Sequence, residues 1–176
     1  MFEIFNNKKI IVASEDCCFD KTIFRLVNDI KPGNIVKIDY NTLKVKIEYQ
    51  SKSTSITKHC IFEYFYFMRK NTTVNNINVS QFRRDIGKLL YKDIQKKVTL
   101  FMRLKQHVKN NQLIVCGIPE SGIIQAQSFS DEIKGTYLQF IEKNKKNPHR
   151  TFILENNKAR LNACKNKYII SKEHQL

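Results

Sequence analysis

The residues best suited by type and spacing to bind a ligand lie together after the middle of the chain: Pro119, Glu120, Ser121 and Gly122. A serine hydroxyl and the backbone amides of a tight loop are fixed hydrogen-bond donors, and phosphate oxygens need several such donors at once. This combination predicts an anion site in which Ser121 contacts a phosphate or its metal ion. The alternative is an ordinary connection in which Ser121 caps the next helix, and the local sequence taken alone favours this alternative.

The flanking sequence predicts how such a loop would be held. An apolar, partly β-branched run ends at Gly117, and the apolar residues after Gly122 recur with helical spacing, a pattern typical of α/β proteins. Ligands in such folds bind beyond the carboxyl end of the strand, where loop amides and the helix start favour anions. We expect the helix to continue to about Lys134 and to end at Gly135. A second strand over residues 137–141 would complete one βαβ unit.

The first fifty residues predict a strand, a helix and a hairpin. Residues 9–13 indicate a buried strand, and Asp20 is a plausible cap for a short helix over residues 20–27. Residues 32–33 are Pro-Gly and predict a turn. Alternating apolar residues on both sides of residues 41–42 are typical of a hairpin.

The middle of the chain starts with a polar connector, residues 50–58. The aromatic content of residues 60–69 predicts burial on at least one side, and a buried Glu63 would then need a basic residue or backbone amides as partner. Ser80 is a good helix cap, and the apolar spacing after it predicts one long helix or two helices broken near Lys96. Further on, the sequence predicts three more segments: a basic loop at 143–150, a short apolar stretch at 151–154 and a helix at 156–164.

Composition places the chain among globular proteins, with 176 residues, 41% of them hydrophobic and 11% aromatic. This length allows one good core or two incomplete pieces. There is no apolar run long enough to cross a bilayer and no signal-peptide pattern, so we expect no membrane partner and a cytoplasmic location. The five cysteines are odd in number and lack the paired spacing of a zinc site, which predicts reduced thiols.

The formal net charge of +15 would attract polyanions. Two explanations compete: a nucleic-acid-binding face, or a compositional bias that spreads lysine over every solvated surface. Asparagine recurs beside lysine along the whole chain, and there is no aromatic-basic recognition motif. We therefore favour bias and do not expect a nucleic-acid partner.

Five stretches, in order along the chain, resemble the amidophosphoribosyltransferases, or glutamine phosphoribosyl-pyrophosphate amidotransferases. Residues 12–20 resemble V-A-S-E-x-C-A-[FL]-D, and residues 29–33 resemble D-[VI]-x-P-G. Residues 60–69 are similar to C-[IS]-[FM]-E-Y-[IV]-Y-F-[AS]-R, the most specific of the five. Residues 118–121 resemble the pyrophosphate loop P-[DE]-[ST]. Residues 143–144 with 150–153 resemble the flexible lid K-N-R-Y-x-G-R-T-F-I.

The resemblance implies an α/β protein, α+β overall, with two partial domains. Residues 1–58 would be the end of a glutaminase domain and residues 59–176 the first half of a phosphoribosyltransferase domain with a parallel βαβ sheet. The complete enzyme uses glutamine-derived ammonia to displace pyrophosphate from phosphoribosyl pyrophosphate, which gives phosphoribosylamine for purine synthesis. The implied partners are those substrates and a possible second copy of the chain.

The resemblance also assigns roles to single residues. Ser121 would contact magnesium and pyrophosphate, and the amides between Pro119 and Gly122 would cradle phosphate oxygens. Lys143 and Arg150 would reach over the substrate when the lid closes, although both are equally explained as solvated loop charges. Cys60 matches a cysteine that ligates an iron–sulfur cluster in some members. Because the other ligands lie far downstream and are absent here, we expect a buried structural thiol and no cluster.

Other family features are missing from these 176 residues. The sequence starts Met1-Phe2 without the family's N-terminal cysteine nucleophile, and it ends near where the acidic motif V-D-D-S-I-V-R-G-T should begin. The lid departs from the pattern at Lys145, Lys146 and His149. We therefore assign no catalytic residue and expect this chain alone to be inactive. The alternatives are a non-catalytic binding or regulatory module, docking through residues 61–67, and a basic nucleic-acid binder.

Overall fold

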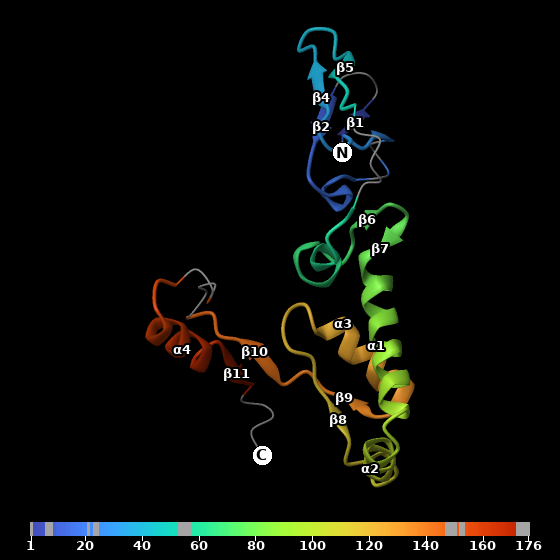
Figure 1. Ribbon diagram of the computed structural model, residues 1–176, viewed down its shortest axis with the longest axis vertical. Helices are drawn as coiled ribbons and strands as arrows, with labels where there is room; N and C mark the ends of the chain where they lie inside the picture. The colour runs from blue at the N-terminus through green and yellow to red at the C-terminus, as the bar shows by residue number, and fades with distance from the viewer. Residues whose placement is uncertain are drawn as a thin grey trace. The chain divides into compact units, whose positions relative to one another are not determined.

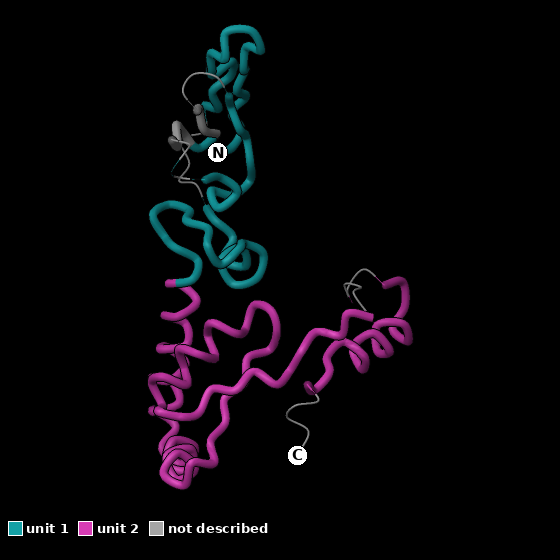
Figure 2. The backbone as a smooth tube through the Cα atoms, turned by 180° about the vertical axis from the view of Figure 1, so that it is seen from behind, with its two compact units in different colours: residues 1–80 teal, residues 81–176 magenta. Residues whose placement is uncertain are grey.

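The computed structural model describes residues 2–5, 9–20, 22, 25–52, 58–146, 151 and 154–171. The chain divides into two compact units, residues 1–80 and residues 81–176, called here the N-terminal and C-terminal units (Figure 1, Figure 2). Small sheets and helices alternate along the chain, which confirms the mixed α/β class. The domains implied by resemblance, 1–58 and 59–176, stay a prediction because the two units are defined by packing alone.

The N-terminal unit begins with a three-stranded antiparallel sheet. Strand β1 (Phe2–Phe5) lies between β2 (Lys9–Val12) and β3 (Arg25–Asn28). The prediction that the strand at residues 9–13 is buried is wrong, because Val12 is 54% exposed. As an edge strand, β2 has a hydrogen-bonded neighbour on one side only.

Strand β3 replaces the helix predicted over residues 20–27, so that prediction is wrong. The Asp20 carboxylate accepts the amide of Thr22 (2.9 Å) and its hydroxyl (2.6 Å), a local turn that leads into the strand instead of capping a helix. Residues 25–28 then pair with β1, and this distant partner satisfies the backbone groups that a helix would have satisfied locally. Residues 21, 23 and 24 lie outside the described part of the chain.

The predicted hairpin is confirmed. Strands β4 (Ile35–Ile38) and β5 (Val45–Tyr49) pair antiparallel, and the predicted Pro-Gly turn precedes them, with Gly33 at φ 76°. The connecting loop is held by Asp39, whose carboxylate accepts the amides of Asn41 (3.0 Å) and Thr42 (2.7 Å) and the Thr42 hydroxyl (2.8 Å). These bonds, first those from Thr42, hold the pKa of Asp39 below its ordinary value of 3.8.

Acidification is therefore expected to open this loop. A carboxylate with a lowered pKa in the folded state stabilises that state above its ordinary pKa, and the contribution is lost as the pH falls through the folded-state pKa. The amide resonances of Asn41 and Thr42 should shift together with a midpoint below 3.8. An Asp39→Asn variant, which cannot titrate, should show no such transition, and a midpoint above 3.8 in the parent protein would contradict the assignment.

The remainder of the N-terminal unit joins two segments that are distant in sequence. The 3₁₀ turn η1 (Asp16–Cys18) contacts β6 (Thr73–Val74), the first strand of a short hairpin with β7 (Ile77–Asn78). The half-buried Glu15 carboxylate accepts the Arg69 amide (2.9 Å) and the Thr72 hydroxyl. The carboxylates that accept backbone amides here are thus Glu15 and Asp16, which takes the Thr73 amide (2.8 Å), whereas the sequence had directed attention to Glu63.

The aromatic segment forms a turn of π-helix, η2 (Glu63–Phe67), closed by the Met68 amide bonded to the Glu63 carbonyl (2.8 Å). Burial of this segment is confirmed for Tyr64, which is 6% exposed. The prediction required burial on one side only, and four residues of the segment stay more than half exposed: Ile61, Phe62, Tyr66 and Phe67. Cys60 is also exposed, which corrects the expected buried thiol, because the chain turns only the Tyr64 side of this segment inward.

Helices α1 (Val79–Gln95) and α2 (Val98–Lys109) confirm the second form of the helix prediction, two helices broken near Lys96. Ser80 is not the cap, because α1 already begins at Val79 and the Ser80 hydroxyl donates to the Lys70 carbonyl (2.6 Å). No described helix combines the length and apolar character needed to cross a membrane. The five cysteines are all free, as predicted.

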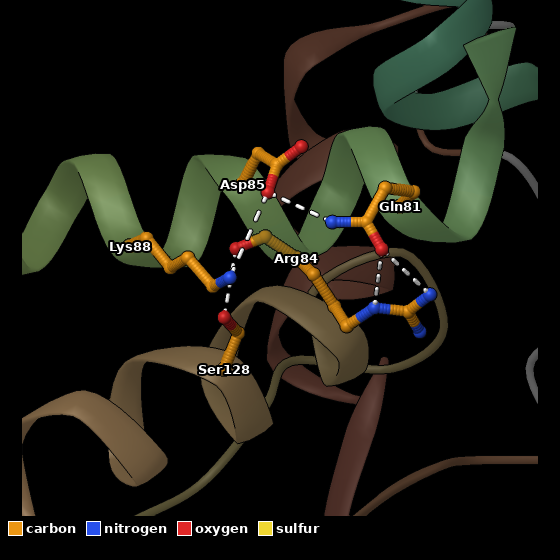
Figure 3. Close-up of polar contacts among 5 residues, drawn as sticks. All are labelled: Gln81, Arg84, Asp85, Lys88 and Ser128. Atoms are coloured by element: carbon orange, nitrogen blue, oxygen red, sulfur yellow. Dashed lines mark hydrogen bonds and ion pairs between the residues drawn. The ribbon is translucent and has the colours of Figure 1, made fainter.

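The C-terminal unit contains the predicted βαβ arrangement. Strands β8 (Ile114–Val115) and β9 (Thr136–Tyr137) pair in parallel and are connected by α3 (Ile123–Ile133). Helix α3 packs against α1, where the Ser128 hydroxyl donates to the Arg84 carbonyl (2.7 Å; Figure 3). The end of α3 corrects a detail: Lys134 takes the left-handed conformation (φ 64°) one residue before Gly135.

The chain then forms a second small sheet. The single strand predicted over residues 137–141 is in fact two, because β9 ends at Tyr137 and β10 (Ile141–Lys143) pairs with β11 (Tyr168–Ile170). Between β10 and β11 lies α4 (Asn157–Lys165), which confirms the last predicted helix. The Asn156 side chain caps it by accepting the Ala159 amide (2.9 Å).

Candidate functional site

The predicted anion loop is a tight turn between β8 and α3. The Gly122 amide donates to the Ile118 carbonyl (3.0 Å), and the peptide bond between Pro119 and Glu120 is cis. The loop returns so closely on its own start that a Cβ on Gly117 would lie 2.6 Å from the Ile123 Cα atom. Glycine is therefore required where the strand meets the loop.

Only some loop amides are available to a ligand. Pro119 has no N–H group, and the Gly122 amide is already bonded inside the loop. Within the described residues the amides of Glu120 and Ser121 have no acceptor. These two donors, together with the first turn of α3, are what the loop offers to an anion.

Ser121 is half-buried, and its hydroxyl has no hydrogen-bond partner among the residues described. The alternative in which Ser121 caps the helix is wrong, because the N-cap of α3 is Gly122 and no side chain caps that end. The hydroxyl is thus a hydrogen-bond donor and acceptor without a described protein partner, in the loop that follows the carboxyl end of a parallel strand. Such a position favours contact with a ligand.

Lys143, predicted from the lid resemblance, lies near the predicted loop. Its Nζ atom is 3.9 Å from a carboxylate oxygen of Glu120, and both side chains are largely exposed, so the ion pair itself contributes little stability. Its significance is positional, because one end of β10 delivers a cation to the mouth of the loop. Arg150, the other predicted lid residue, lies outside the described residues, as do residues 147–149.

Two polar residues beside the loop were not predicted as part of a site. The Tyr137 hydroxyl donates to the Gln139 side-chain oxygen (2.5 Å), and the Gln139 amide nitrogen donates to the carbonyl of Gly117 (2.8 Å). Burial, and then the nearby Cys116 thiol, raise the pKa of Tyr137 above its ordinary value of 10.0, so the hydroxyl keeps its proton. The sequence predicted both residues to lie in one strand, residues 137–141. The polar Gln139 within that predicted strand was the only feature of the sequence that indicated a different role.

A separate hollow of about 350 Å³ lies between α1, α3 and β9. The residues lining it are Arg84, Ile124, Gln127, Ser128, Asp131 and Tyr137. None of the predicted loop or lid residues lines it, although Ile124 lies in the first turn of α3 and Tyr137 bonds to Gln139. The hollow is therefore not the predicted pyrophosphate site.

Comparison with known proteins shows what this chain is similar to. No family model matches the chain. The amidophosphoribosyltransferase of Methanocaldococcus jannaschii is 30% identical to it over 172 residues, 88% of this chain and 32% of that protein. The enzyme of the same name from Methanothermobacter thermautotrophicus is 30% identical over 156 residues, 88% of this chain and 29% of that protein. Over 88% of its length, the chain is thus similar to about a third of an amidophosphoribosyltransferase.

Solved structures agree with this relationship at the level of the fold. The glutamine phosphoribosylpyrophosphate amidotransferase of Bacillus subtilis, solved with ADP and GMP, has 22% sequence identity and a TM-score of 0.58. The match covers 98% of this chain and 34% of that one. The chain thus spans about a third of the length of the amidophosphoribosyltransferases that it matches.

Proposed function

We propose that the chain provides the pyrophosphate-binding part of an amidophosphoribosyltransferase. In the complete protein, ammonia from glutamine would displace pyrophosphate from phosphoribosyl pyrophosphate to form phosphoribosylamine for purine synthesis. One observation carries this proposal. The Ser121 hydroxyl, which neither caps α3 nor forms a hydrogen bond with a described residue, lies in a tight loop beyond the parallel strand β8, in a chain similar in sequence to these enzymes. Pro119, Glu120, Ser121 and Gly122 would form the loop, and Lys143 and Arg150 would cover it.

The described residues do not build a resident magnesium site. They contain no group of three or more histidine, cysteine, aspartate or glutamate side chains that could hold a metal ion. Magnesium commonly reaches such loops already bound to phosphate oxygens, so we assign Ser121 a contact to pyrophosphate and keep its contact to magnesium as a prediction. An iron–sulfur cluster on Cys60 is not proposed.

Pyrophosphate binding is expected to depend on Ser121. Calorimetric titration of pyrophosphate and of phosphoribosyl pyrophosphate, each with magnesium, should give measurable affinity for residues 1–176. Ser121→Ala should weaken it about tenfold, since a hydrogen bond to a charged group is worth about 1.5–3 kcal/mol. Ser14→Ala, an exposed serine in the N-terminal unit, is the matched control. Equal affinities in the Ser121 and Ser14 variants would contradict the role of the loop.

Residues 1–176 alone are expected to form no phosphoribosylamine from phosphoribosyl pyrophosphate with either glutamine or ammonium. The resemblance places the cysteine nucleophile and the acidic pair in segments that these residues do not contain. A coupled assay of pyrophosphate release tests this, with heat-treated protein as the control. Release above that control would show that the described loop and its neighbours are sufficient for chemistry.

A non-catalytic docking module is the second candidate, and the exposed side chains of the aromatic segment favour it. Ile61, Phe62, Tyr66 and Phe67 are each more than half exposed, and apolar side chains exposed close together often mark an interaction site. Light scattering of the purified chain would distinguish the candidates. A monomer that binds pyrophosphate favours the first, and a stable oligomer without pyrophosphate affinity favours the second. Cytoplasmic location and a homo-oligomer stay predictions.

A further inference from the structure

Gln139 uses all the polar atoms of its side-chain amide to connect three parts of the C-terminal unit. Its nitrogen donates to the carbonyl of Gly117 (2.8 Å) and to the carbonyl of Ile141 (2.7 Å). Its oxygen accepts the hydroxyl of Tyr137 (2.5 Å). The residue is half-buried, so the three bonds are partly shielded from competing water.

These bonds replace a missing step in the parallel ladder between β8 and β9. The Thr136 amide donates to the Leu113 carbonyl (3.0 Å), and the Leu138 amide donates to the Val115 carbonyl (3.0 Å). The same series would next give the Gly117 carbonyl a backbone amide. The Gln139 side chain supplies that donor instead, so the chain can leave β8 while the base of the loop stays anchored.

The two carbonyls that Gln139 holds belong to the two sides of the candidate site. Gly117 is the residue from which the loop starts, and Ile141 is the first residue of β10, which carries Lys143. A single side chain therefore sets the spacing between the loop amides and the lysine. The two carbonyls can only accept, so the amide nitrogen faces them, and the Tyr137 hydroxyl holds that orientation by donating to the amide oxygen.

We propose that Gln139 is a positioning residue that holds the anion loop and Lys143 in register for one phosphate group. The inference rests on the proposed pyrophosphate site for its ligand, but its structural part stands on the three bonds alone. Without Gln139 the carbonyl of Gly117 keeps only the weak bond from the Cys116 thiol (3.7 Å), and the loop is free to turn its amides away from the anion. Gln139 itself does not contact the ligand.

The test compares Gln139→Leu with Gln106→Leu, the same change at an exposed position on α2. In the absence of ligand, the Glu120, Ser121 and Lys143 amides of Gln139→Leu should shift and exchange faster with solvent than in the parent. In calorimetry, pyrophosphate affinity should fall about tenfold in Gln139→Leu while the thermal midpoint changes little, because misplaced donors lose binding more than folding. Gln106→Leu should match the parent in every measurement.

The outcomes separate the two ideas. Unchanged amide exchange at Glu120 and Ser121 in a folded Gln139→Leu would overturn the inference, whatever the protein binds. A parent protein without pyrophosphate affinity, in which Gln139→Leu still loosens those amides, would overturn the proposed function and leave the positioning role intact. If Gln139→Leu does not fold, Tyr137→Phe removes only the hydroxyl that orients the amide. It should shift the same resonances by less, and no shift would overturn the inference.

Discussion

Replacing Gly87 by alanine is expected to lower the free energy of unfolding of the C-terminal unit by about 3 kcal/mol, an overpacking effect. Gly87 lies where α1 crosses α3, and a Cβ there would be 2.4 Å from the Gln125 carbonyl oxygen and 2.8 Å from the Ser128 Cβ atom. The carbonyl belongs to helical backbone, so it cannot move without shifting α3. The short Ser128 bond to the Arg84 carbonyl, which marks the same crossing, would be lost with it (Figure 3).

The sign of this effect is diagnostic. In an isolated helix, glycine to alanine stabilises by about 1 kcal/mol, so helix propensity and packing predict opposite outcomes. Urea denaturation followed by circular dichroism measures the difference. Gly135→Ala is the matched control, because a Cβ there comes no nearer than 3.3 Å to the movable Leu113 side chain, 3.4 Å to the Leu113 carbonyl and 3.5 Å to the Ile133 side chain. A Gly87→Ala protein as stable as the control would mean that α1 and α3 do not pack this closely.

Replacing Glu15 by alanine is expected to destabilise the N-terminal unit by about 2 kcal/mol, mainly the cost of leaving the buried Thr72 hydroxyl without its carboxylate acceptor. The Arg69 amide and the Thr72 hydroxyl both donate to this carboxylate, more than fifty residues away in sequence. The Cys17 thiol also lies 3.8 Å from it. Losing Glu15 therefore removes one of the contacts that tie residues 13–20 to the start of the β6–β7 hairpin, while Asp16 still accepts the Thr73 amide (2.8 Å).

Two variants make the Glu15 prediction specific. Glu15→Gln keeps an oxygen acceptor and should recover more than half of the lost stability. Glu48→Ala removes an exposed carboxylate of the same unit, whose ion pair with Lys46 at 3.9 Å should matter little. Thermal unfolding of the four proteins, followed by the Tyr64 environment, would order them. If Glu15→Ala and Glu48→Ala unfold together, the contact does not stabilise the unit.

Turn-forming residues that act on their neighbours in sequence explain the parts of the fold that were predicted correctly. Gly117 and Gly122 bracket a turn whose strand and helix are each visible in a few neighbouring residues. The β4–β5 hairpin and the break between α1 and α2 also depend on residues close in sequence. In each case the turn chemistry and the apolar period agree, so the local preference and the final structure coincide.

Pairing with distant segments explains the errors. Residues 25–28 form a strand because they pair with β1, and the sequence of residues 25–28 does not by itself predict that partner. Ser80 bonds to Lys70 instead of capping α1, because the chain returns to that carbonyl after ten residues. Cys60 and Phe62 are exposed although their residue types suggest burial, since the turn of η2 directs only Tyr64 inward.

The sequence by itself determined the family resemblance, the strand–loop–helix around Ser121 and the identity of the loop residues, because these depend on residue type and short spacing. Only the tertiary structure decided that the Ser121 hydroxyl is not a helix cap, that Lys143 reaches Glu120 and that Gln139 joins the loop to β10. The physical reason is distance along the chain. A hydrogen bond across 22 residues depends on where two strands come to lie, and local propensity carries no information about that placement.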